Sequence, residues 1–156
     1  MPKKPETVKW EDLNWRKDGL FYKKYARVPF TGVCESFHEN GQLEWGVNFK
    51  NGQRDGLWEQ FYDNGQLQGR GNHKNGVMHG PFEWYHENGQ LKYKGNYKDG
   101  YENGLHESFY NTGQLQRREN YKTGKLDGLW EYFDEEGNLT LTWMYSNGKL
   151  IHDQET

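Results

Sequence analysis

Apolar and polar residues alternate along most of this chain in short stretches, and most stretches end at a polar residue followed by glycine. Alternation at every second position is typical of β-strands whose two faces meet different surroundings. Ten such dipeptides occur between Asn40-Gly41 and Asn147-Gly148, and seven of them begin with Asn or Asp. Asn-Gly and Asp-Gly favour two-residue type I′ turns, so the pattern predicts long antiparallel strands joined by tight hairpin turns.

The pattern also repeats with a constant period of 24 residues. A period of this length indicates a repeat protein in which each unit is one supersecondary element. We therefore predict an all-β fold, an elongated array of antiparallel β-hairpins that forms a single-layer twisted sheet. The predicted turn glycines are Gly41, Gly52, Gly65, Gly76, Gly89, Gly100, Gly113, Gly124, Gly137 and Gly148. A third glycine series, Gly32, Gly56, Gly80, Gly104 and Gly128, has the same period, and its last four members are predicted to mark bulges or wider turns.

The period divides the chain into three parts. Residues 1–31 are predicted to be an N-terminal cap with a shortened unit, because terminal units of repeat proteins are usually atypical. Residues 32–151 hold five repeats, the last incomplete, and residues 152–156 form a C-terminal tail. The apolar spacing in residues 1–18 does not distinguish a strand from a short helix.

Two-residue turns would fix the pairing of the strands. Around Asn64-Gly65 they place Asp63 opposite Gln66, Tyr62 opposite Leu67, and Glu59 opposite Arg70. The same register pairs Glu83 with Lys94 and Glu107 with Arg118. Cross-strand pairs of opposite charge contribute about 0.2–1 kcal/mol each, so their recurrence supports the register more than it contributes to stability.

This register predicts one aromatic face and one face of Glu and Lys/Arg residues. On the aromatic face, the columns of residues 58 and 60 differ from unit to unit and present Trp, Tyr and Phe side chains. Trp and Tyr dominate the energetics of protein interfaces. We therefore expect a partner-binding surface that includes Trp58, Tyr62, Phe82, Trp84, Tyr93, Trp130 and Tyr132.

Composition agrees with a thin folded protein. Only 32% of the residues are apolar, but 17% are aromatic and the net charge is -3, which argues against disorder. The single cysteine, Cys34, excludes an internal disulfide. No signal peptide or membrane-spanning stretch occurs in the sequence, so we expect a cytoplasmic protein. Basic residues are not clustered, which argues against nucleic acid as a partner and makes a membrane partner unfavoured.

The sequence offers no catalytic or metal-binding motif. The recurrent Glu35, Glu59, Glu83, Glu107 and Glu131 are interpreted as partners of basic residues rather than as an acid–base pair. The six histidines lack metal-ligand spacing and are interpreted as ordinary surface residues. We therefore predict a chain that is not an enzyme and has no cofactor and no metal.

Several segments resemble the MORN-repeat superfamily, and more closely its variant in bacterial YwqK-type antitoxin proteins. They are ENGQL (39–43 and 87–91), DGLWE (55–59 and 127–131), GNYKDG (95–100), VPFTG (28–32) and DGLFYKK (18–24). The resemblance implies a non-enzymatic, protein-binding scaffold, and for the bacterial variant an antitoxin or immunity protein that neutralises a toxin by contact. The alternatives are a carbohydrate-binding module that uses the aromatic face and a membrane-associated scaffold. The exposed ends of the sheet are also compatible with a homodimer.

Overall fold

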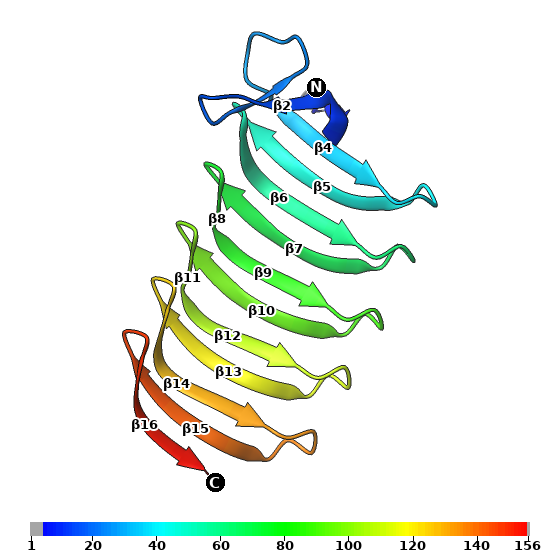
Figure 1. Ribbon diagram of the computed structural model, residues 1–156. Coiled ribbons are helices and arrows are strands. Elements are labelled where there is room, and N and C mark those ends of the chain that lie inside the picture. The colour runs from blue at the N-terminus through cyan, green and yellow to red at the C-terminus, as the bar shows by residue number, and fades with distance from the viewer. Residues whose placement is uncertain (1–4, 156) are drawn as a thin grey trace. The chain divides into compact units, whose positions relative to one another are not determined.

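The computed structural model describes residues 5–155, which form two units, residues up to Val77 and residues from Met78 onward. Almost all regular structure is β-strand (Figure 1). The first unit contains β1 (Thr7–Lys9), the 3₁₀ helix η1 (Trp10–Asp12), β2 (Leu13–Trp15), β3 (Phe21–Lys23), β4 (Gly32–Phe37), β5 (Leu43–Lys50), β6 (Gln53–Phe61) and β7 (Leu67–Lys74). The second contains β9 (Gly80–Tyr85), β10 (Leu91–Lys98), β11 (Tyr101–Glu102), β12 (Gly104–Phe109), β13 (Leu115–Lys122), β14 (Lys125–Phe133), β15 (Leu139–Ser146) and β16 (Lys149–Glu155). The short strand β8 (Val77–Met78) lies at the boundary.

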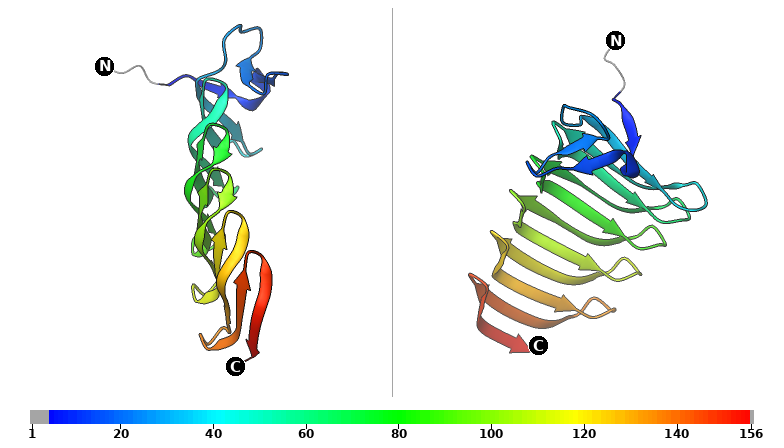
Figure 2. Two further views of the ribbon diagram at one scale, coloured as in Figure 1. Left: turned by 90° about the vertical axis from the view of Figure 1, so that its left-hand side faces the viewer. Right: turned by 45° about the horizontal axis from the view of Figure 1, so that its top comes forward.

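Successive strands pair as antiparallel neighbours in each unit. The order is β4-β5-β6-β7 in the first unit and β9-β10-β12-β13-β14-β15-β16 in the second. Each set forms a single layer, as the edge-on view in Figure 2 shows. The predicted antiparallel hairpin repeat is therefore confirmed. Strand β16 extends to Glu155 and includes residues that the sequence assigned to a C-terminal tail.

The ten turns belong to two kinds, which alternate along the chain. At Asn51-Gly52, and at the four equivalent positions, both residues have positive φ, as a type I′ turn requires. The other five turns have positive φ only at glycine, so the prediction of two-residue turns is wrong there. At residues 63–65 the Gly65 N–H donates to the Tyr62 carbonyl and the Tyr62 N–H donates to the Gln66 carbonyl. These bonds define a three-residue loop, a type I turn followed by a left-handed glycine.

In the type I′ turns asparagine adopts a positive φ, whereas in the three-residue loops it acts through its side chain. The Gln66 N–H donates to the Asn64 side-chain oxygen at 2.9 Å, so the amide stabilises the loop without a left-handed conformation. The Asn88 amide nitrogen also donates to the Asn111 carbonyl of the following repeat, at 2.8 Å. The same dipeptide therefore serves two turn types.

Each three-residue loop is one residue longer than the predicted turn, and it shifts the strand register by one residue in the adjoining part of the hairpin. Phe61, not Tyr62, lies opposite Leu67, and neither Tyr62 nor Asp63 lies within β6, so these two predicted pairings are wrong. Beyond the bulge the predicted register is confirmed, with Glu59 opposite Arg70. The pairs of Glu83 with Lys94 and of Glu107 with Arg118 are confirmed as well.

Two glycines of the third series, Gly56 and Gly128, lie at strand irregularities, at the end of the hairpin away from the three-residue loop. In β6 the register moves by two residues around Gly56, which has a φ of 99°. The side-chain amide of Asn48 bridges the irregularity by donating to the Leu57 carbonyl at 2.7 Å. Gly128 has a φ of 118° at the equivalent irregularity of β14, so the prediction of bulges is confirmed at these two positions.

Consecutive repeats are joined by backbone hydrogen bonds with the same period. The N–H of the type I′ glycine donates to a carbonyl of the preceding repeat, from Gly52 to Phe30, Gly76 to Arg54, Gly100 to Met78, Gly124 to Glu102 and Gly148 to Leu126. Because each repeat supplies the same donor and acceptor, the period of the sequence fixes the stacking of the turns along this edge.

The N-terminal cap covers one face of the first repeat. Strand β1 runs parallel to β4, and β2 and β3 form a separate hairpin that lies to one side of the first unit (Figures 1 and 2). Leu13 and Phe30 of the cap are buried with Cys34 and Phe49 of the repeat. The cap therefore combines strand with a short helix, the two alternatives that the sequence left open.

Candidate functional site

The aromatic face of the second unit consists of two rows of cross-strand neighbours. The turn-side row contains Trp84, Tyr93, Ser108, Arg117, Tyr132 and Leu141. The central row contains Phe82, Gly95, His106, Glu119, Trp130 and Trp143. Five of the predicted site residues belong to these rows, and all except Phe82 are half-buried.

Rings of the central row pack closely against one another and against the turn-side row. Phe82 is only 4% exposed and lies 5.3 Å from the Tyr93 ring, centroid to centroid. Trp130 stacks on Trp143 at 4.6 Å, with an angle of 18° between the rings. These contacts stabilise the sheet and orient the rings whose outer surfaces remain accessible.

His106 occupies the centre of this row and is fully buried, so its interpretation as an ordinary surface histidine is wrong. The tautomer that satisfies its contacts donates from Nε2 to the Asn96 carbonyl at 3.0 Å and accepts at Nδ1 from the Tyr93 hydroxyl at 2.9 Å. The ring fills the space above Gly95, where a Cβ atom would lie 2.6 Å from Nδ1. Glycine at 95 therefore matches the histidine on the neighbouring strand.

A charged pair lies beside His106. The Glu119 side chain is 5% exposed, and its Oε1 lies 3.4 Å from Nη2 of Arg117, which is two residues away on the same strand face. Burial and the Glu119 carboxylate raise the pKa of Tyr121 to about 12 and also raise the pKa of Tyr93. A buried carboxylate is costly without a partner, so Arg117 compensates for Glu119.

Arg117 is the most accessible charged group of the two rows. Its side chain is 39% exposed, and its Nη2 lies 3.4 Å from the hydroxyl of Ser108. Within residues 5–155, the buried Nε donor has no hydrogen-bond acceptor. The guanidinium therefore lies among aromatic side chains with part of its donor capacity unused.

Trp58 and Tyr62, the remaining predicted site residues, belong to the first unit. Trp58 is half-buried between Val47 and Gly71 on the neighbouring strands. Tyr62 lies in the chain just before a three-residue loop. Residues at the equivalent position, His38, His86 and Tyr110, donate side-chain hydrogen bonds to backbone carbonyls of the following repeat. This column connects repeats, which the sequence analysis did not recognise.

The cap shows what can cover the aromatic face. Trp45 and Phe49 of β5 occupy the repeat positions that hold Arg117 and Tyr121 in the second unit. The ring of Trp10 lies 5.7 Å from Trp45, and the ring of Phe21 lies 5.3 Å from Phe49. A short segment of this chain thus packs its own aromatic rings on the face of the first unit.

The opposite face of the second unit is a continuous line of ion pairs. Lys94 lies 2.9 Å from Glu107, and Arg118 lies 3.4 Å from both Glu107 and Glu131. Because each of these carboxylates has a basic neighbour, the line neutralises itself. This arrangement agrees with the interpretation of the recurrent glutamates as partners of basic residues.

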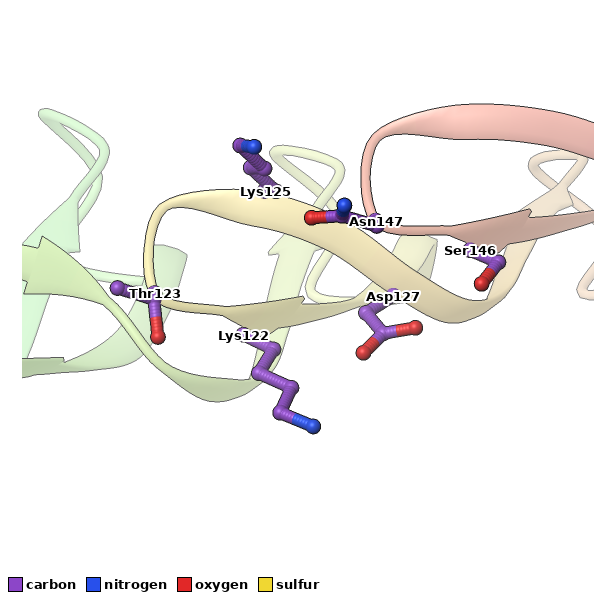
Figure 3. A pocket seen from close by; sticks show the side chains of 6 residues that line it. All are labelled: Lys122, Thr123, Lys125, Asp127, Ser146 and Asn147. Carbon is purple, nitrogen blue, oxygen red and sulfur yellow. The ribbon is translucent and has the colours of Figure 1, made fainter.

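Neither the pocket of the second unit nor the carboxylate and imidazole groups of residues 5–155 form a ligand or metal site. An open pocket of about 390 Å³ is lined by Lys122, Thr123, Lys125, Asp127, Ser146 and Asn147. Lys122 and Lys125 point to opposite sides of it, so they do not converge on one ligand (Figure 3). Among the described residues, no group of three or more His, Cys, Asp or Glu side chains could hold a metal ion.

Sequence reasoning missed His106, Arg117 and Glu119. All three depart from the repeat, since the equivalents of Glu119 are Val47, Gly71, Gly95 and Trp143. A comparison of the strand that follows each three-residue loop would have revealed a charged residue in an otherwise apolar or glycine column.

The hairpin repeat and its two faces define a repeat-based binding or scaffold module. The chain belongs to the MORN repeat variant family, whose profile matches residues 30–51, 54–75, 78–99, 102–123 and 126–147. No curated protein matches the chain. No helix in residues 5–155 is long and apolar enough to cross a membrane.

Proposed function

We propose that the chain is a non-enzymatic binding module that holds a segment of another protein on the aromatic face of its second unit. The observation that carries this proposal is the cap, which packs Trp10 and Phe21 on Trp45 and Phe49 at equivalent positions of the first unit. A face that binds a short aromatic segment within the chain has the chemistry to bind one from a partner.

The composition of the second unit supports the same proposal. Trp84, Tyr93, Trp130 and Tyr132 are half-buried, so each ring is held by neighbours and still presents surface. Rings that are already ordered lose little conformational entropy when a partner binds. Trp, Tyr and Arg are also the residues most enriched in interface hot spots, and Arg117 lies in the same row.

The test is selection of a phage-displayed library of random peptides on the immobilised full chain. We expect enriched peptides that carry aromatic or aliphatic residues and bind less tightly to a Tyr132→Ala variant. The matched control is Phe133→Ala, the next residue on the same strand, whose ring lies beneath Arg118 on the ion-pair face. Failure to enrich any peptide, or equal loss of binding in both variants, would contradict the proposal.

A truncation within the second unit separates binding from folding. Trp84→Ala should weaken binding of a selected peptide while the far-ultraviolet circular dichroism spectrum stays of β type. Unfolding of this variant would show that the ring serves the sheet alone.

The narrower proposal is that the bound protein is a toxin, which the chain neutralises as an antitoxin or immunity protein. It is supported by the resemblance of segments such as DGLWE (55–59) to YwqK-type antitoxin proteins. The product of a neighbouring gene is the first candidate. Growth arrest by that product, relieved by the wild-type chain but not by Tyr132→Ala, is expected, and absence of relief by the wild type would contradict it.

A further inference from the structure

We propose that the segment bound on the second unit presents an Asp or Glu carboxylate to Arg117, which makes this arginine the specificity determinant of the face. This inference rests on the proposed function, because it concerns the chemistry of the same bound segment. The supporting observations are the position of Arg117 in the turn-side row, its incomplete hydrogen bonding, and the residue that occupies its position in the first unit.

Arg117 lies near the middle of the turn-side row, between Ser108 and Tyr132 as their direct cross-strand neighbour. Ser108 has the smallest side chain of that row, so the guanidinium is flanked by a short side chain on one side and a ring on the other. A segment that packs on Tyr93 and Tyr132 must therefore pass over Arg117.

The hydrogen bonds of Arg117 within the chain are long. Its Nη2 approaches Glu119 and Ser108 at 3.4 Å each, which is long for a charge-assisted hydrogen bond. The buried Nε donor has no acceptor among the described residues, while the side chain is 39% exposed. Because Nε is buried, an incoming carboxylate would contact the guanidinium through its two Nη groups, from which it can accept two parallel bonds that are shorter than the present contacts.

Glu119 orients Arg117 and does not itself contact the partner. It is 5% exposed and lies in the central row, beneath the surface that a partner would touch, so it holds the guanidinium in place and does not compete at the surface. In the first unit the position of Arg117 is held by Trp45, which binds the apolar ring of Trp10. The replacement of a ring by a guanidinium at this position changes the preferred partner group from apolar to anionic.

Selection from the random peptide library tests this inference. We expect peptides enriched on the wild-type chain to contain an acidic residue between aromatic or aliphatic ones. A synthetic selected peptide should bind at least about tenfold more tightly than its Asp→Asn or Glu→Gln form. An Arg117→Gln variant should bind both forms alike, because the group that distinguishes them has been removed.

Two further variants separate recognition from folding. Arg118→Gln removes the same charge from the neighbouring residue on the opposite face, and it should keep the preference for the acidic peptide. Glu119→Gln releases Arg117 from its internal partner, and it should bind the acidic peptide more tightly than the wild type does. A merely structural Arg117–Glu119 pair would not produce this increase.

The results distinguish failure of this inference from failure of the proposed function. Failure to enrich any peptide on the wild type would overturn the proposed function, and this inference with it. Enriched peptides without acidic residues, equal binding of acidic and amide forms, or a preference that persists in Arg117→Gln would overturn the inference and leave the proposed function standing.

Discussion

Gly95→Ala is expected to destabilise the second unit through a steric conflict with a single ring. The added Cβ would lie 2.6 Å from Nδ1 and 2.7 Å from Cγ and Cε1 of His106. That ring is fully buried, is hydrogen-bonded to Tyr93 and Asn96, and lies 4.8 Å from the Tyr121 ring. It therefore cannot move without loss of other contacts.

The expected magnitude follows from these contacts. Overpacking of a well-packed site costs about 1–3 kcal/mol, and a weakened hydrogen bond adds about 0.5–1.5 kcal/mol. The lower entropy of the unfolded chain with alanine returns about 0.4–1 kcal/mol. The net loss in the free energy of unfolding should be about 2 kcal/mol, measured by urea denaturation followed by tryptophan fluorescence.

The control is Gly46→Ala. Gly46 also lies in a strand without positive φ, but the nearest atom that its Cβ would meet is Glu35 Cγ at 4.0 Å. This variant should be neutral or slightly stabilised. Addition of His106→Ala to Gly95→Ala should remove the clash, so the two changes should be non-additive by at least about 1 kcal/mol. Equal stability of Gly95→Ala and Gly46→Ala would refute the steric account.

Three other predictions follow from particular contacts. Asn88→Ala removes bonds to Gln90 and Asn111 and should cost about 1–2 kcal/mol in urea denaturation, whereas Thr112→Ala at the equivalent turn position should cost little. Burial raises the pKa of Cys34 from 9.0 to about 11, so its contribution to stability is complete below pH 9 and is lost as the pH rises towards 11. Cys34→Ala should lose less stability over that range, and an equal loss would contradict the assignment. Glu107→Gln removes the carboxylate between Lys94 and Arg118 and should cost about 0.5–1 kcal/mol at low salt. That difference should shrink at about 1 M NaCl, and a salt-independent difference would point to packing.

The parts of the fold that the sequence could predict are those that depend on local chemistry and on the period. The type I′ turn at Asn51-Gly52 and the pairing of Glu59 with Arg70 follow from residues close in sequence. The three-residue loop at residues 63–65 was missed because Asn-Gly fits both turn types. In such loops the asparagine side chain also bonds to the next repeat, as in the bond from Asn88 to Asn111, and a contact of this kind lies outside the dipeptide itself.

The site was predicted less completely, because it too depends on contacts between residues that lie on different strands. The aromatic rows were visible because Trp and Tyr recur at strand positions, but burial of His106 depends on Gly95 and Tyr93 on another strand. The parallel pairing of β1 with β4 depends on contacts between residues far apart in sequence. Periodicity alone does not indicate such contacts, because they join residues of different strands or involve residues that precede the repeats.

Binding of a protein segment to the aromatic face of the second unit can be observed residue by residue. The most direct measurement is a titration of a selected acidic peptide into the ¹⁵N-labelled full chain, observed by two-dimensional NMR. We expect shifts of the indole N–H signals of Trp84 and Trp130 and of the side-chain signals of Arg117, while Trp15 of the cap stays unchanged. Shifts confined to Arg118 and the other residues of the ion-pair face would contradict this expectation.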